Sequence, residues 1–190
     1  MDNKYWLVLL GLFCLIIALR VVLNWFILPS IYTLIIFIVP LAYFLYKKDY
    51  YIFYFNTSDT LPSIRVNLVF AIGFITLILV GSLFFKNYSW ALLSDKNSLD
   101  LILGLLVSFF QEMLFRYFLQ GTIVKLTNST IKSIIFTSVL NGAVFLPSIL
   151  ESIVFLIAGL FIGYIFEKTK DIYGATLANF LISSFIRVIA

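Results

Sequence analysis

Long apolar runs that carry few charges recur along the chain, and they constrain its fold more than any other feature. Apolar residues make up 63% of the 190 residues and charged residues only 12%, whereas a soluble domain is about half apolar and about a quarter charged. A run of ~20 apolar residues is long enough to cross a bilayer as a helix. We therefore predict an all-α fold, a polytopic transmembrane helix bundle of about seven spans.

Proline, glycine and short polar stretches interrupt the apolar runs and set the expected span boundaries. The spans are expected at roughly residues 5–27, 30–46, 66–85, 98–126, 131–146, 148–166 and 172–190. Residues 50–65 and 86–97 have the aromatic and charged side chains of interfacial segments, and 127–130 and 167–171 predict tight turns. We divide the chain into N-terminal transmembrane helices with interfacial loops (1–97) and a four-helix membrane core (98–190).

Basic residues give the expected orientation. If the N-terminus is on the inner side, inner loops hold eight Lys and Arg residues and the outer side holds three. The inner residues are Lys4, Lys47, Lys48, Arg65, Lys125, Lys132, Lys168 and Lys170. The positive-inside rule then predicts a cytoplasmic N-terminus, and we expect the membrane to be a bacterial plasma membrane. Because the basic residues are scattered over the loops, we expect no nucleic-acid partner, whereas the apolar spans imply membrane lipids as partners.

Two opposite charges lie one helical turn apart inside the run at 98–126. Glu112 and Arg116 share a helix face, and a charge at membrane depth costs several kcal/mol unless it is paired or hydrated. The pair is therefore a candidate functional site, although it also fits a structural ion pair between helices. Ser108 and Gln120 continue the same stripe at intervals of four residues.

Two later spans also carry polar side chains, among them Asn141 on one and Asn179 and Ser183 on the other. In lipid, polar faces must turn toward one another or toward a hydrated cavity. We therefore predict one polar pocket, lined by Ser108, Glu112, Arg116, Gln120, Asn141, Asn179 and Ser183. Gly159 and Gly163, four residues apart, predict close contact between helices.

The residue types that are absent exclude several kinds of chemistry. The chain has no His and one Cys. A His-based zinc site, a His general base and a His-containing nucleophile triad are therefore not available to this chain alone. We expect no metal and no cofactor.

The order of these features resembles the CAAX-protease and bacteriocin-processing (CPBP) family of intramembrane proteases, also called the abortive-infection family. The family's first motif, Glu-Glu-x-x-x-Arg, corresponds to Gln111-Glu112-Met113-Leu114-Phe115-Arg116. The second, an aromatic residue followed three residues later by His, corresponds to 141–145. The third, a Gly-rich stretch and charged turn before a helix with His, corresponds to 159–169 and 174–183. The resemblance covers roughly 101–183 and implies a CPBP-like core in the C-terminal half.

The same resemblance indicates that the catalytic residues are replaced. Carried over position by position, it places Gln111 at the Glu that activates water, and Phe145 and Asn179 at the two His positions. Ser183 stands at the terminal Asn position, whereas the second Glu and the Arg are retained. Gln cannot accept a proton at neutral pH and Phe has no ring nitrogen. We therefore expect no catalytic residues, and interpret the chain as a pseudoprotease.

Three functions remain open from the sequence. The first is a catalytically inactive CPBP-type protein that acts as a regulatory or scaffolding partner of another integral membrane protein or membrane-anchored enzyme. The second is an active intramembrane endopeptidase with a rearranged site, in CAAX or bacteriocin leader processing or in self-immunity. The third is a small membrane transporter subunit, against which stands the lack of a visible inverted repeat.

Overall fold

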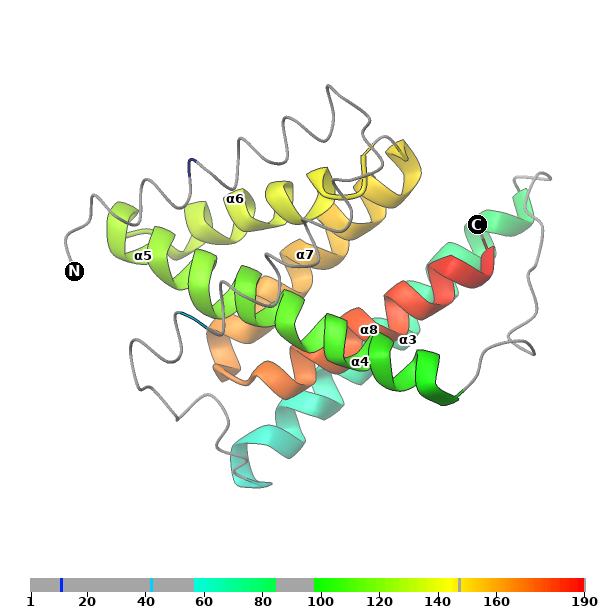
Figure 1. The fold of residues 1–190 in the computed structure, drawn as a ribbon, viewed down its shortest axis with the longest axis horizontal. Helices are drawn as coiled ribbons and strands as arrows, with labels where there is room; N and C mark the ends of the chain where they lie inside the picture. Colours follow the sequence, from blue (N-terminus) through cyan, green and yellow to red (C-terminus); the bar gives the residue numbers. More distant parts are fainter. Residues whose placement is uncertain (1–10, 12–41, 43–56, 85–97, 147, 190) are drawn as a thin grey trace.

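The elements of the computed structural model are helices throughout the residues that it describes, which are 11, 42, 57–84, 98–146 and 148–189 (Figure 1). They are α3 (Thr57–Phe84), α4 (Ser98–Glu112), the π-helical segment η3 (Met113–Gln120), α5 (Gly121–Thr127), α6 (Thr130–Ala143), α7 (Ile149–Thr169) and α8 (Ile172–Ile189). The predicted spans at 5–27 and 30–46 and the predicted interfacial segment at 86–97 lie outside the described residues. The all-α fold class is confirmed for the rest.

Three helical segments within the described residues are long and apolar enough to cross a membrane, namely Thr60–Gly81, Leu101–Thr127 and Ile149–Thr169. Ile172–Ile186 adds a shorter apolar helix. α6 has 14 residues, which at 1.5 Å per residue is about 21 Å and shorter than a bilayer core of ~30 Å. The predicted span at 131–146 is therefore a shorter helix, and the predicted total of seven spans stays a prediction.

The start of α3 differs from the sequence-based expectation. We predicted an interfacial segment up to residue 65, but the helix begins at Thr57 and includes Pro62. Tertiary contacts explain the difference, because Ser63 and Asn67 are fully buried on one face of this part of α3. The Ser63 hydroxyl donates to Thr169 Oγ1 at 3.3 Å, which ties the start of α3 to the end of α7.

The predicted span at 98–126 forms one continuous helical stretch from Ser98 to Thr127, in which η3 is a wider π-helical part. Its end is capped as the sequence predicts: Asn128 has the left-handed conformation, with φ 51°. Ser129 then accepts a hydrogen bond from Lys132 N at the start of α6. The buried side chains of η3 include both apolar residues and members of the polar stripe.

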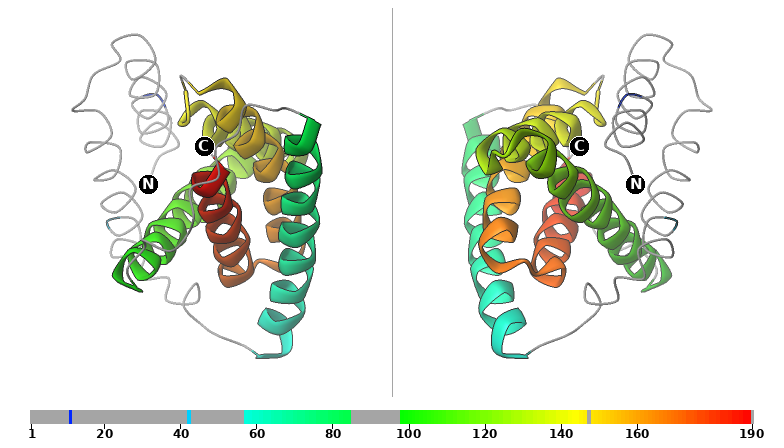
Figure 2. Two further views of the ribbon diagram at one scale, coloured as in Figure 1. Left: turned by 90° about the vertical axis from the view of Figure 1, so that its right-hand side faces the viewer. Right: turned by 90° about the vertical axis from the view of Figure 1, so that its left-hand side faces the viewer.

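Small residues bring α6 and α7 close together. A methyl group built on Gly159 would lie 3.2 Å from Ser138 Cα, and one on Gly142 would lie 2.6 Å from the Ser152 carbonyl oxygen. α8 packs against both α3 and α4 (Figures 1 and 2). The apolar core between α3, α7 and α8 consists of Ala71, Phe155, Ala158, Ile162, Ala175, Ala178 and Ile182. These contacts place η3 in the interior, beside α6 and α7.

Candidate functional site

The charged pair of the polar stripe lies fully inside the protein. Arg116 Nε donates to Glu112 Oε2 at 3.0 Å, and both side chains have 0% exposure. The guanidinium also directs Nη1 toward Thr137 Oγ1 on α6, at a longer 3.4 Å. Two charges this deep in an apolar bundle must compensate each other, because neither side chain is exposed to bulk solvent.

α7 approaches this pair at a glycine. A methyl group built on Gly163 would lie 2.9 Å from Arg116 Nη1 and 3.2 Å from Gln120 Oε1. A side chain at position 163 would therefore displace the guanidinium or the amide. The small residue allows the buried charge to lie directly against the α7 backbone.

Gln120, one turn after Arg116, joins η3 to the end of α7. Its Nε2 donates to the Gly163 carbonyl oxygen at 3.1 Å and to Glu167 Oε2 at 3.1 Å. Glu167 also pairs with Lys170 in the charged turn before α8. The stripe therefore extends from the bundle interior to the charged end of α7.

Gln111 connects α4 to α6 and, through it, to α7. Its Nε2 donates to Asn141 Oδ1 at 3.0 Å, and Asn141 Nδ2 donates to the Phe155 carbonyl oxygen at 3.3 Å. The Phe145 ring, in the turn after α6, stacks on the Phe155 ring with centroids 3.7 Å apart and planes 6° apart. Gln111 is therefore linked through Asn141 to the backbone of Phe155, and Phe145 packs on the Phe155 ring.

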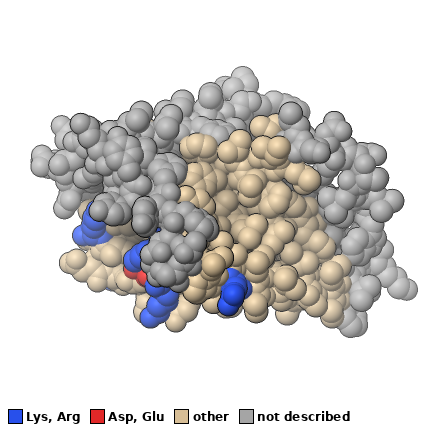
Figure 3. All heavy atoms as spheres, turned by 90° about the horizontal axis from the view of Figure 1, so that it is seen from below, with Lys and Arg blue, Asp and Glu red and all other residues tan. Residues whose placement is uncertain are grey.

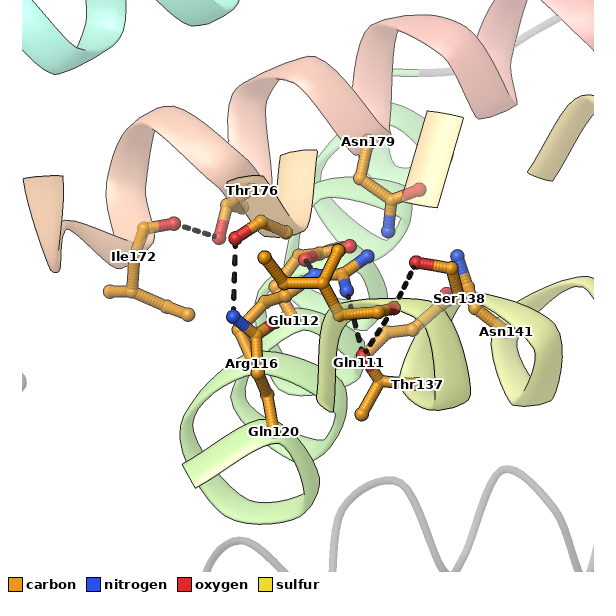
Figure 4. Close-up of polar contacts among 12 residues, drawn as sticks. Gln111, Glu112, Arg116, Gln120, Thr137, Ser138, Asn141, Ile172, Thr176 and Asn179 are labelled. Atoms are coloured by element: carbon orange, nitrogen blue, oxygen red, sulfur yellow. Dashed lines mark hydrogen bonds and ion pairs between the residues drawn. The ribbon is translucent and has the colours of Figure 1, made fainter. Parts of the chain in front are cut away.

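α8 contributes the remaining predicted positions. The Asn179 side chain points from α8 toward Glu112 and Arg116 (Figure 4). The Ser183 hydroxyl, one turn later and half-buried, donates to Asn179 Oδ1 at 3.3 Å. Ser108 is buried on α4. The predicted stripe residues therefore come from helices that meet around the ion pair, while Ser183 and Phe145 lie further out.

Residues 96–185 match the protein-family model described as type II CAAX prenyl endopeptidase Rce1-like. This part of the chain is an Rce1-like domain. The resemblance to the CPBP protease family is thus confirmed for these residues, which include all the motif positions discussed above. Comparisons with curated proteins and with solved structures gave no match.

The Rce1-like domain has a polar contact with α3 that the sequence analysis did not single out. A methyl group built on Gly174 of α8 would lie 2.7 Å from both Asn67 Nδ2 and Ser63 Oγ. Asp171 Oδ2 accepts from Gly174 N at 2.8 Å at the start of α8. The spacing of Thr60, Ser63 and Asn67 at three and four residues is the signal that could have identified this face.

The acidic side chains of the domain do not gather into a metal site within the part of the chain that the structure describes. No group of three or more His, Cys, Asp or Glu side chains there could hold a metal ion. The polar groups of the described site are amides, hydroxyls and the carboxylate and guanidinium of one buried ion pair. Amides and hydroxyls donate and accept hydrogen bonds but do not remove a proton from water at neutral pH.

Proposed function

We propose that this chain is a catalytically inactive integral membrane protein whose Rce1-like domain serves as a regulatory or scaffolding partner of another membrane protein. One observation carries the proposal: Gln111, at the position of the family's water-activating Glu, donates its amide to Asn141. A general base in this place typically contributes ~10²–10⁴-fold to a rate. A Gln held as a hydrogen-bond donor supplies none of it.

The other two replaced positions support the same function. Phe145 has its ring stacked on Phe155, and Asn179 is an amide that already accepts from Ser183. Neither side chain exchanges protons in the neutral range. The retained Glu112 and Arg116 are used in pairing with each other, which suits a structural role.

The exposed charges support a plasma-membrane location with one basic end on the cytoplasmic side. Exposed basic residues in the described part of the chain lie near the start of α3, the α5–α6 turn and the end of α7. They are Arg65, Lys125, Lys132, Lys168 and Lys170. Figure 3 shows charged side chains along one edge of the described surface, with other residues over the rest. Such a basic end favours the inner face of a membrane.

The scaffolding role is tested by partner capture from native membranes. The tagged full-length chain is cross-linked in cells, extracted in mild detergent and analysed by mass spectrometry. We expect the same integral membrane protein or membrane-anchored enzyme in every preparation. In a control preparation with a tagged unrelated helix bundle, this partner should be present only at background level. A monodisperse monomer with no reproducible companion contradicts the role.

One observation favours a second candidate, an active endopeptidase with a rearranged site. Glu112 Oε1 has no hydrogen-bond partner within the described residues, so one carboxylate oxygen is available to a substrate or to water. This candidate requires that Glu112→Gln abolish cleavage of a prenylated peptide. Equal inertness of the wild type and of Glu112→Gln would remove it.

A further inference from the structure

Among the buried polar atoms without a hydrogen-bond partner in the described residues, three belong to the ion pair and to Asn179, whereas Gln120 Oε1, which also lacks one, lies beside Gly163 of α7. The three are Glu112 Oε1, Arg116 Nη2 and Asn179 Nδ2. The exposures of these residues are 0%, 0% and 2%. A buried donor or acceptor without a partner costs about 1–3 kcal/mol, so all three atoms need an explanation.

The neighbouring atoms of the same three groups are already used. Glu112 Oε2 accepts from Arg116 Nε, and Arg116 Nη1 faces Thr137 on α6. Asn179 Oδ1 accepts from Ser183 on α8. In Figure 4 the Asn179 amide points at the ion pair, so that its Nδ2 is directed to the same side as the free ends of the carboxylate and the guanidinium.

The three atoms comprise two donors and one acceptor, and this composition selects the ligand. Arg116 Nη2 and Asn179 Nδ2 need an acceptor, whereas Glu112 Oε1 needs a donor. A peptide carbonyl accepts only, and a cation is repelled by the guanidinium. A water molecule accepts two hydrogen bonds and donates the third, and buried waters in proteins typically make about three hydrogen bonds to such groups.

We propose that a single buried water molecule bridges Glu112 Oε1, Arg116 Nη2 and Asn179 Nδ2. The water connects η3 to α8, which makes Asn179 a positioning residue that fixes α8 against the ion pair. This inference goes beyond the proposed function, because it concerns how the helices are held together. It requires neither hydrolysis nor a partner protein.

The direct test is an experimental structure of the full chain in lipid, at a resolution that orders internal water. We expect one solvent peak within hydrogen-bond distance of all three atoms. A reversed Asn179 amide that accepts directly from Arg116, or another protein or partner group in contact with the three atoms, would show that the proposal is wrong.

A set of variants tests the same site by thermal unfolding in detergent. Asn179→Leu removes the donor and fills the space of the water, so it should lower the Tm by several degrees. Ser183→Ala is the matched control, because it removes only the other hydrogen bond of Asn179 and should lower the Tm less. Asn179→Ser leaves space and a hydroxyl for water, so it should retain a Tm above that of Asn179→Leu.

Two outcomes of this comparison count against the water. One is a Tm of Asn179→Leu equal to that of the wild type. The other is an Asn179→Ser variant no more stable than Asn179→Leu, which would point to the shape of the Asn side chain rather than to hydration. If Asn179→Leu does not accumulate, the solvent peak in the Asn179→Ser structure decides, and its absence overturns the proposal.

Discussion

Removal of the guanidinium from the buried ion pair should destabilise the protein strongly. Arg116→Met keeps most of the apolar volume of the side chain but leaves the Glu112 carboxylate, at 0% exposure, without its partner at 3.0 Å. Removing one member of a buried pair costs about 3–5 kcal/mol, because the other charge is left uncompensated. The contact with Thr137, at 3.4 Å, is too long to add much.

This free energy converts into a measurable change in Tm. For a protein of this size, each kcal/mol corresponds to a shift of about 2–4 °C. Arg116→Met should therefore lower the Tm by roughly 6–20 °C, a range that follows from about 3–5 kcal/mol. Thermal unfolding in detergent, followed by the amount of protein that remains monodisperse after heating, measures it.

Two further variants control this experiment. Arg65→Met makes the same change at an exposed position on α3, where substitutions usually stay within about 0.5 kcal/mol. Glu112→Leu combined with Arg116→Met removes both charges, and should recover much of the lost stability. The reasoning is refuted if Arg116→Met melts like Arg65→Met, or if the double variant is no more stable than Arg116→Met.

Two other predictions concern contacts between helices. Gly142→Ala should lower stability by about 1–3 kcal/mol, because its methyl group would lie 2.6 Å from the Ser152 carbonyl oxygen. Gly73→Ala has nothing within 4 Å and should be neutral or stabilising by up to ~1 kcal/mol; a larger loss for Gly73→Ala than for Gly142→Ala in thermal unfolding would contradict the packing. Gln120→Leu should cost about 1–3 kcal/mol, since it removes the hydrogen bonds to α7, including that to Glu167. An unchanged Tm for Gln120→Leu would mean that these bonds contribute nothing.

Local patterns predicted the helices of the C-terminal half and the turns between them. The run at 98–126 corresponds to the helical stretch that ends at Thr127, because a long apolar run can satisfy its backbone only as a helix in lipid. The predicted turns contain Asn128 and Lys170, the two non-Gly residues with positive φ in the described part of the chain. The four-residue period of polar side chains did not single out an inward face of η3, because its apolar side chains are buried as well.

Contacts between distant residues were beyond the reach of these patterns. Gln120 and Glu167 are 47 residues apart, and nothing in their local sequence links them. The early start of α3 depends on Ser63 and Asn67 packing against Gly174, a tertiary contact that outweighs the local effect of a proline. Periodicity gives the face of a helix, but the partner of that face depends on how the whole bundle packs.

Peptide hydrolysis by the purified wild type in liposomes tests the central claim most directly. A prenylated peptide of the CAAX type is the substrate, and mass spectrometry detects any C-terminal fragment. The triple variant Gln111→Glu, Phe145→His and Asn179→His, which restores the family's residues, is assayed beside it. We predict that the wild type releases no fragment. Release of a fragment by the wild type, abolished by Glu112→Gln, would contradict the account.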